Sequence, residues 1–352
     1  MKIAPLYHAL KKENWSAPFI VHTGQHYDLN MSDVFFKDLR LPEPNLHLGV
    51  GSGTHAEQTG RVMIAYETAI MEETPDLVVV VGDVNSTVAV TLAAVKLGIK
   101  VAHLEAGLRS FDRTMPEEIN RLVTDALADI LWTPSPDADD NLIKEGVPPG
   151  KIVRVGNIMI DSLEMLRRKI ENQAIYTEFG LNKCGFGLVT LHRPSNVDNP
   201  DILERLTRVL LRIAERIPLI FPVHPRTKKN LEDHRLINTL DKTQGIFLVE
   251  PLNYIRFMNL VFNCRMAITD SGGIQEETTY LGIPCLTLRP NTERPITIKE
   301  GTNKLCTVEN LEDQVDNVLS GRATKHIVPE LWDGQTAGRV VNSIIREICR
   351  LL

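Results

Sequence analysis

Runs of apolar residues alternate with amphipathic segments along almost the whole of this 352-residue chain. Several runs, such as Leu77–Val81, are continuously apolar, as expected of strands that helices cover on both faces. The predicted strands are Pro18–Val21, Leu77–Val81, Lys100–Leu104, Asp129–Trp132, Gly187–Leu191, Leu219–Val223, Ile246–Val249, Met266–Thr269 and Cys285–Leu288. The predicted helices between them are Ala56–Glu73, Ser86–Leu97, Glu118–Leu127, Ile202–Arg216 and Leu252–Asn263. The alternation predicts an α/β fold with doubly wound parallel sheets.

The alternation of predicted strands and helices stops near Val155-Gly156-Asn157 and begins again at Phe186. Ile158–Ile170 predicts a bridging helix, and Gly338–Leu352 predicts a last helix after the second sheet. We therefore expect two doubly wound, Rossmann-like domains, residues 1–157 and 158–337, followed by a C-terminal helix at 338–352. Two such domains with a cleft between them, and a last helix crossing back, would form the GT-B architecture.

The first residues predict a helix, because Ile3, Leu6, Tyr7 and Leu10 recur at helical spacing. A doubly wound domain usually begins with a strand that lies in the middle of its sheet. We therefore expect that the true start lies upstream, or that this domain lacks a central strand and one phosphate-binding turn.

Composition excludes several classes of protein. The apolar content of 43% and charged content of 24% are ordinary for a globular protein, and the net charge of −6 does not favour a nucleic-acid or acidic-membrane partner. No apolar run approaches the roughly 20 residues of a membrane span, and the first residues lack the long apolar core of a signal peptide. The five cysteines form no C-x-x-C pair, which is typical of reduced thiols. We expect a cytoplasmic protein without a membrane or nucleic-acid partner.

Titratable side chains stand where the predicted strands end, and ligands of open parallel sheets bind at the carboxyl ends of the strands. Each of these residues can be polar for solvation alone, but their convergence at one cleft favours a binding or catalytic site. The residues are Asp83, Glu105, His192, Arg193, His224 and Arg226, and Ser271 lies at a further strand end.

The turn Asp270–Gly273, between a predicted strand and a predicted helix, contains two glycines and Ser271. Glycines let backbone N–H groups approach a ligand, and the helix N-terminus behind them favours an anion. Glu276 and Glu277 follow on the helix, where neighbours lie about 100° apart, so only one of them can face the turn. A phosphate at the turn and a carboxylate for sugar hydroxyls would form a nucleotide site; the alternative is an ordinary crossover turn with a good helix cap.

A further carboxylate pair, Glu117 and Glu118, follows Pro116 at a predicted helix start. Proline and acids in a first turn are also typical of a helix N-terminus without any other role. Arg121 lies four residues after Glu117, at the spacing of a helical ion pair, which permits a purely structural role. Acids that cluster raise one another's pKa, so that one donates a proton while another accepts it.

Sequence patterns of other sites are absent. The chain contains no H-x-x-x-H or H-E-x-x-H pattern of metal ligands and no G-x-S-x-G of an α/β-hydrolase. Gly49-Val-Gly51-Ser-Gly53 lacks the third-glycine spacing of a dinucleotide fingerprint and leads into Thr54, which we expect to be a helix N-cap. We predict neither a metal nor a bound cofactor.

Motifs spread in order over both predicted domains resemble one family, the non-hydrolysing UDP-N-acetylglucosamine 2-epimerases. They are VHTGQHYD (21–28), GDVNST (82–87), HLEAGLRS (103–110), MPEEINR (115–121), GN (156–157), LHRPSN (191–196), HPR (224–226), TDSGGIQEE (269–277) and TERP (292–295). The resemblance implies a GT-B fold, a homodimer, a UDP-sugar substrate, no metal and no nicotinamide.

The resemblance also implies a mechanism. UDP leaves C1 while the C2 proton is removed, a 2-acetamidoglucal stays in the cleft, and UDP adds back with a proton on the opposite face of C2. By motif position, the catalytic residues match Asp83, Glu105, Glu117 and His192. The residues that bind UDP or the sugar match Lys2, Arg121, Ser271, Gly272, Gly273, Glu277 and Arg294, and the strand-end residues Arg193, His224 and Arg226 join them. Which carboxylate is the acid and which the base stays open.

Three features depart from the family pattern. The family opens with a strand and a GTRPE-type loop, and Lys2 falls at the lysine of that loop, so a chain starting at Met1 is expected to show weak or no activity and a damaged N-terminal sheet. The HR-x-EN motif has Ser195 in place of its glutamate. Tyr27 and Gly53-Thr-His-Ala lie where polar residues of an allosteric UDP-N-acetylglucosamine site usually lie, so allosteric activation is not expected.

Several functions stay open beside 2-epimerisation of UDP-N-acetylglucosamine to UDP-N-acetylmannosamine. The substrate can be a related UDP-sugar, such as a diacetamido-uronate or a 6-deoxy sugar. A hydrolysing epimerase would release free N-acetylmannosamine. A GT-B glycosyltransferase would share the nucleotide site, although the set Asp83, Glu105 and Glu117 argues against it because a transferase moves no C2 proton. A nucleotide-sugar-binding protein without activity is the non-enzyme alternative.

Overall fold

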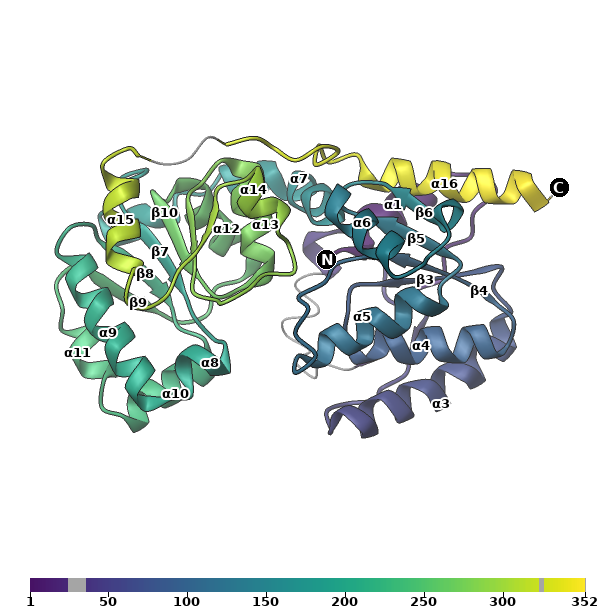
Figure 1. The fold of residues 1–352 in the computed structure, drawn as a ribbon, viewed down its shortest axis with the longest axis horizontal. Helices are drawn as coiled ribbons and strands as arrows, with labels where there is room; N and C mark the ends of the chain where they lie inside the picture. Colours follow the sequence, from purple (N-terminus) through teal and green to yellow (C-terminus); the bar gives the residue numbers. More distant parts are fainter. Residues whose placement is uncertain (25–35, 323–325, 352) are drawn as a thin grey trace. The chain divides into compact units, whose positions relative to one another are not determined.

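The computed structural model describes residues 1–24, 36–322 and 326–351, and the chain divides into two compact units (Figure 1). Unit 1 comprises Met1–Met165 and Glu330–Leu352, and unit 2 comprises Leu166–Pro329. The chain therefore passes from unit 1 to unit 2 inside helix α7 (Ile158–Glu171), whereas the sequence placed the boundary just before this helix. The last helix belongs to unit 1, so the chain returns to the unit in which it began.

Unit 1 consists of parallel strands and the helices that connect them. Its elements, with α7 shared between the units, are α1 (Ile3–Leu10), β1 (Val21–His22), β2 (Leu46–His47), α3 (His55–Glu73), β3 (Leu77–Val81), α4 (Asn85–Lys96), β4 (Lys100–Leu104), α5 (Pro116–Leu127), β5 (Ile130–Thr133), α6 (Pro136–Lys144), the 3-10 turn η1 (Pro149–Lys151), β6 (Ile152–Arg154) and α16 (Thr336–Leu351).

Helices cover both faces of the sheet β3-β4-β5-β6 in unit 1 (Figure 1). On one face, Val78 and Val80 pack with Val62 of α3 and Ala93 of α4. On the other face, Leu6 of α1 and Val340 of α16 pack with Leu104, Trp132 and Val155. The continuously apolar runs predicted as buried strands therefore lie between two helical layers.

The described strands of unit 1 form two separate parallel sheets. Strands β1 and β2 pair only with each other, and β3–β6 make the four-stranded sheet. Val21 and Leu48, in and beside the small sheet, nevertheless pack against the same apolar cluster as Val78 and Val80. A strand that joins the two sheets is not among the described residues.

Local sequence signals set several helix starts. Thr54 caps α3 with a capping box in which its side chain accepts from the Glu57 backbone N–H and the Glu57 side chain accepts from the Thr54 backbone, which confirms the predicted N-cap. Pro116 lies in the first turn of α5 with two glutamates behind it, as the sequence predicted.

Unit 2 has one six-stranded parallel sheet in the order β12-β11-β10-β7-β8-β9. Its elements are η2 (Ile175–Phe179), β7 (Gly187–Thr190), α8 (Pro194–Val197), α9 (Pro200–Ala214), β8 (Leu219–Pro222), α10 (Pro225–Asp233), α11 (Ile237–Asp241), β9 (Ile246–Val249), α12 (Tyr254–Asn263), β10 (Met266–Thr269), α13 (Gly272–Leu281), β11 (Cys285–Thr287), α14 (Ile296–Lys299), β12 (Asn303–Leu305) and α15 (Leu311–Leu319). Helices α9 and α15 lie on one face of the sheet and α12 and α13 on the other (Figure 1). Leu206 and Val315 belong to one apolar cluster and Ile274 to another.

The two units confirm the predicted α/β fold class, GT-B with two doubly wound, Rossmann-like units and a C-terminal helix that returns to the first. The sequence missed β2, β6 and β12, which have only two or three residues each and thus too short a pattern to detect. Of the helices in the described parts of the chain, none combines the length and the apolar character needed to cross a membrane.

Candidate functional site

Three of the predicted site residues meet at neighbouring strand ends of unit 1. Asp83 follows β3, Glu105 follows β4, and these two strands pair along their whole length. Lys2 makes an ion pair with Glu105. The position of a Cβ at Gly82 would lie 3.5 Å from both Glu105 Oε2 and Lys2 Nζ, so the lysine reaches the turn that carries Asp83.

Glu105 has an unusual backbone conformation, with a φ of 81° in the left-handed region. Such a φ in a non-glycine residue costs about 1–3 kcal/mol and is kept only where the surroundings enforce it. The carbonyl of Trp132 enforces it here, since it accepts at 3.0 Å from both the Glu105 N–H and the Ala106 N–H. The buried carboxylate is thereby held at the strand end.

Arg121 joins the predicted carboxylate cluster through a partner that the sequence did not indicate. Within the described part of the chain, its guanidinium pairs with Asp83 at 2.8 Å and with Glu118 at 2.5 Å. The helical ion pair suggested with Glu117 is therefore wrong, because Glu118 is the buried member of the two and shares a face of α5 with Arg121. Glu117 lies half-buried in the first turn of α5.

In unit 2, a buried aspartate fixes the turn that carries His192 and Arg193. Asp270 Oδ1 lies 3.0 Å from His192 Nδ1, and its carboxylate accepts from the backbone N–H groups of His192 and Arg193. Asn196 donates to the same carboxylate at 3.1 Å. Burial tends to raise the pKa of Asp270, but the bond to His192 and these backbone and side-chain donors outweigh it and hold the pKa below its usual range. The carboxylate is thus ionised and orients His192.

His224 stands beside His192, with ring centroids 5.5 Å apart. Burial, followed by the charges of His192 and Arg226, lowers the pKa of His224. Its Nδ1 accepts from the backbone N–H of Arg226, so this histidine caps α10. The side chain of Arg226 pairs instead with Asp198 at the surface, apart from the two histidines.

The predicted anion-binding turn lies between β10 and α13. Ser271 is the N-cap of α13, and Gly272 and Gly273 form its first turn, so backbone N–H groups point out of the helix start. Gly272 approaches two side chains closely: a Cβ there would lie 2.8 Å from Glu293 Oε1 and 2.9 Å from Arg294 Nη1. A side chain at this position would therefore have to displace the ends of the buried Glu293 and Arg294 side chains.

Both glutamates of α13, Glu276 and Glu277, are buried, and each binds a different side chain. Glu276 binds Arg294 Nε at 2.9 Å, and Glu277 accepts from the Tyr254 hydroxyl at 2.7 Å. Burial raises the pKa of Glu277 to about 7, and the negative charge of Glu276 adds to this rise while the Tyr254 hydroxyl opposes it. Glu277 is thus a carboxyl that gains or loses its proton near neutral pH.

The predicted residues therefore gather in two clusters. Lys2, Asp83, Glu105 and Arg121 meet in unit 1, while His192, Arg193, His224, Ser271, Gly272, Gly273, Glu277 and Arg294 lie around the ends of β7, β8 and β10 in unit 2. Tyr27, a position named for the allosteric site, lies outside the described residues. In the described chain, no group of three or more His, Cys, Asp or Glu side chains has the arrangement of a metal site.

Sequence reasoning did not predict that three carboxylates hold these clusters in place. Asp270, Asp125 and Glu118 are each at most 2% exposed and accept backbone N–H bonds from the turns of the site. A detectable signal existed for Asp270, which is a charged residue directly after a continuously apolar strand. No comparable signal existed for Asp125, which lies in the middle of an amphipathic helix.

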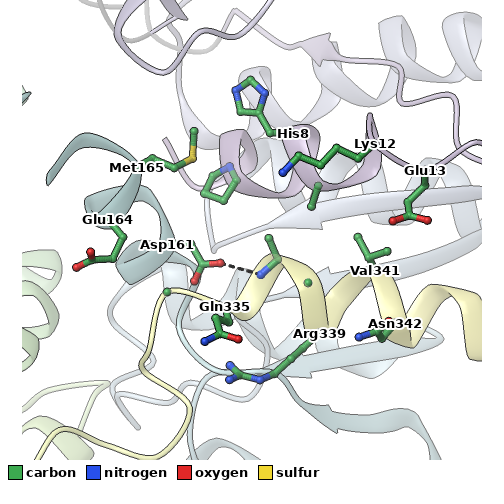
Figure 2. Close-up of a pocket in the computed structure, with 15 residues that line it drawn as sticks. His8, Lys12, Glu13, Asp161, Glu164, Met165, Gln335, Arg339, Val341 and Asn342 are labelled. Atoms are coloured by element: carbon green, nitrogen blue, oxygen red, sulfur yellow. Dashed lines mark hydrogen bonds between the residues drawn. The ribbon is translucent and has the colours of Figure 1, made fainter. Parts of the chain in front are cut away.

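A pocket of about 720 Å³ lies elsewhere in unit 1, between α1, α7 and α16, and contains none of the predicted site residues. Figure 2 shows Asp161 of α7 pointing to the start of α16, where it accepts from the backbone N–H of Ala337 at 2.8 Å. Polar side chains of both signs, such as Lys12, Glu13 and Arg339, line the pocket. Asp161 of this pocket holds the first turn of the last helix through the backbone N–H groups of Thr336 and Ala337.

Gly272→Ala is expected to destabilise unit 2 by about 1–3 kcal/mol. The added methyl displaces Glu293 and Arg294, and both are held in buried ion pairs, Glu293 with Arg289 and Arg294 with Glu276. Urea unfolding followed by circular dichroism measures the loss of stability.

The matched control is Gly273→Ala, one residue further along the same turn. A Cβ at Gly273 meets no heavy atom within 4 Å, so this variant should fold as stably as the unchanged protein. Equal stability of the two variants would contradict the packing argument at Gly272.

Comparisons with known proteins agree on one family. The sequence model of the UDP-N-acetylglucosamine 2-epimerases matches residues 8–345. The UDP-N-acetylglucosamine 2-epimerase of Methanocaldococcus jannaschii is 45% identical over 312 residues, which cover 87% of this chain and 84% of that protein. The crystal structure of the M. jannaschii enzyme in complex with UDP-GlcNAc and UDP is similar with a TM-score of 0.88 and 41% identity, covering 98% of this chain and 96% of that one. The UDP-2,3-diacetamido-2,3-dideoxy-D-glucuronate 2-epimerase of Pseudomonas aeruginosa is 40% identical over 312 residues, 87% of this chain and 84% of that protein.

Proposed function

The chain belongs to the UDP-N-acetylglucosamine 2-epimerase family, and from this premise we propose that it epimerises C2 of a UDP-N-acetylhexosamine, converting UDP-N-acetylglucosamine to UDP-N-acetylmannosamine. The proposed reaction is non-hydrolysing: UDP leaves C1 as the C2 proton is removed, and UDP returns to the resulting 2-acetamidoglucal. No bond to water is made, and the C2 proton lost on one face is replaced on the other.

The observation that carries the proposal is the pair of carboxylates at adjacent strand ends of unit 1. Epimerisation at C2 requires one group that removes a proton from one face and another that delivers a proton to the other. Asp83 and Glu105 stand on paired parallel strands, and each has its own cation, Arg121 for Asp83 and Lys2 for Glu105. Two carboxylates in separate ionic environments suit two distinct proton-transfer roles.

Unit 2 supplies groups that suit a nucleoside diphosphate. The start of α13 offers backbone N–H groups to a phosphate, and Arg193 and His192 add donors from the neighbouring strand end. Glu277 offers a carboxylate to the ribose hydroxyls. These groups together would keep UDP bound between its departure from C1 and its return. UDP then adds back to the 2-acetamidoglucal before either molecule leaves the protein.

A related UDP-sugar is the second candidate substrate. The 40% identity to a UDP-2,3-diacetamido-2,3-dideoxy-D-glucuronate 2-epimerase favours it, and the proton chemistry at C2 would be the same. The substituents at C3 and C6 of the sugar would distinguish the two substrates.

Incubation with UDP-N-acetylglucosamine in D2O, followed by proton NMR, tests the proposal. We expect deuterium at C2 together with the appearance of UDP-N-acetylmannosamine. If only a UDP-diacetamido-uronate exchanges its C2 proton, the proposed substrate is wrong and the proposed mechanism stands. Free N-acetylmannosamine as the product would identify a hydrolysing epimerase, and UDP binding without exchange of either sugar would identify a binding protein.

We further propose that the enzyme is a cytoplasmic homodimer without allosteric activation. The segment Gly53–Ala56 supports the last point, because Thr54 is engaged in the cap of α3 and the His55 ring lies 3.1 Å from the Asn85 amide nitrogen. We expect hyperbolic progress without a lag when UDP-N-acetylmannosamine is the sole substrate, and a lag that UDP-N-acetylglucosamine abolishes would contradict this. Light scattering coupled to gel filtration measures the oligomeric state.

A further inference from the structure

His103 of β4 is fully buried beneath the carboxylate cluster of unit 1, and both of its ring nitrogens face acceptors. Nδ1 lies 2.6 Å from Asp125 Oδ1, and Nε2 lies 2.9 Å from the carbonyl oxygen of Gly82. A carbonyl oxygen only accepts, so Nε2 carries a proton. Nδ1 then also carries one if Asp125 is ionised, because a carboxylate only accepts.

The partners of Asp125 show that its carboxylate is ionised. Its Oδ2 accepts from the Gly107 backbone N–H at 3.0 Å and lies 2.8 Å from Arg109 Nη1. Arg109 also makes a bidentate ion pair with Glu145, in which Nε and Nη2 donate to the two carboxylate oxygens at 2.8 and 2.7 Å. Glu145 lies at the surface, so Asp125 is the buried carboxylate of this network. Its Oδ2 already has donors in Gly107 and Arg109, and the proton donor that its Oδ1 faces at 2.6 Å is Nδ1–H of a positive His103 imidazole.

Asp125 thereby holds both turns that carry the proposed acid and base. Through His103 it reaches the carbonyl of Gly82, the residue directly before Asp83. Through its second oxygen it reaches the N–H of Gly107, two residues after Glu105. Glu105, between these two contacts, has a φ of 81°, a conformation that a non-glycine residue keeps only where its surroundings enforce it.

We propose that His103 and Asp125 form a buried imidazolium–carboxylate pair that positions Asp83 and Glu105 for proton transfer at C2. The pair acts on the backbone beside each carboxylate, through the carbonyl of Gly82 and the N–H of Gly107. The effect of the His103–Asp125 pair on catalysis rests on the proposed function. The charge of the pair and its hydrogen bonds to the two turns do not.

Asp125→Leu and Asp125→Asn separate this role from a general contribution to folding. Leucine removes the acceptor of the Gly107 N–H and the partner of His103 Nδ1, which orients the ring toward the Gly82 carbonyl. We therefore expect kcat to fall about 100-fold, the effect of a small misplacement of catalytic groups. The Kd for UDP should change by less than about threefold, because the proposed phosphate-binding turn at the start of α13 lies in unit 2.

Asparagine is the conservative variant, because its side-chain oxygen can still accept from the Gly107 N–H. Its NH2 group can donate to Nδ1 of a neutral His103, and the Nε2–H of that ring still donates to the Gly82 carbonyl. We expect kcat of Asp125→Asn to stay within about tenfold of the unchanged protein, the effect of exchanging one hydrogen bond for another. A folded Asp125→Leu protein with unaltered kcat would overturn the proposal. So would a loss in Asp125→Asn as large as in Asp125→Leu, since the charge and not the positioning would then matter.

The imidazole itself gives a readout that needs no turnover. In the unchanged protein at pH 7, nitrogen-15 NMR of the His103 ring is expected to show a proton on both nitrogens, and in Asp125→Asn a proton on one. A single proton in the unchanged protein would overturn the pair even if Asp125→Leu fails to fold. Absence of C2 exchange with every UDP-sugar tested would refute the proposed function alone, and the NMR result would still decide whether the pair exists.

Discussion

Replacing Glu105 with glutamine is expected to lower the rate of C2 deuterium exchange by about 10²- to 10⁴-fold, the range that a positioned acid or base contributes. Glutamine keeps the size of the side chain but neither accepts nor delivers a proton at C2. Glu105 is 8% exposed, is held at a φ of 81° and is paired with Lys2, so a rare backbone conformation is maintained at this position. The measurement is exchange at C2 by proton NMR together with the Kd for UDP.

Asp83→Asn and Glu117→Gln extend the same test to the other proposed catalytic carboxylates. Both should slow exchange while UDP still binds, because the proposed UDP-binding cluster lies in unit 2. Glu164→Gln is the matched control, since Glu164 is also half-buried in unit 1 but lines the pocket beside α16. Normal exchange in all three site variants would refute the assignment of the catalytic carboxylates.

Glu277→Gln is expected to increase the free energy of unfolding, relative to the unchanged protein, more at pH 8 than at pH 5. The pKa of Glu277 is about 7 in the folded protein and about 4.5 in an unfolded chain. Between these values the folded protein holds a proton on Glu277 that the unfolded chain has released. The contribution of Glu277 to the free energy of unfolding therefore falls as pH rises from about 4.5 to about 7 and changes no further above that. The two pKa values correspond to about 3 kcal/mol of lost stability at pH 8.

Glutamine does not titrate, and its oxygen still accepts from the Tyr254 hydroxyl, so the variant escapes this loss. The measurement is the difference in urea-unfolding free energy between variant and unchanged protein at pH 5 and at pH 8. A difference independent of pH would contradict a Glu277 pKa near 7. If Glu277 binds the ribose as proposed, UDP affinity of the unchanged protein should rise as pH increases through 7, because only the ionised carboxylate accepts from two hydroxyls.

Much of the fold followed from local pattern. Continuous apolar runs such as Leu77–Val81 and Met266–Thr269 are strands with the predicted bounds, because a strand buried on both faces contains little else. Thr54 and Pro116 marked helix starts correctly, since capping depends on residues a few positions apart. The strand-end rule likewise pointed to Asp83 and Glu105, because paired parallel strands bring their carboxyl ends to one edge.

Pairing within the site did not follow from local pattern. Helical spacing suggested Glu117 as the partner of Arg121, but Glu118 and Asp83 hold it, because only burial decides which of two adjacent glutamates faces the sheet. Asp125 and Asp270 were not recognised as the residues that fix the turns, since their partners lie 18 to 78 residues away in the sequence.

The sequence by itself determined the class of fold, the strand ends that carry the candidate site residues and the glycine turn before α13. These depend on hydrophobic periodicity and on backbone conformations that few residues adopt. Only the tertiary structure decided which charges meet, that Glu277 is held near its titration point, and that one buried aspartate fixes the turns of both proposed catalytic carboxylates. The reason is that the energy of a charge depends on its burial and on partners brought by packing, and neither is encoded in the residues beside it.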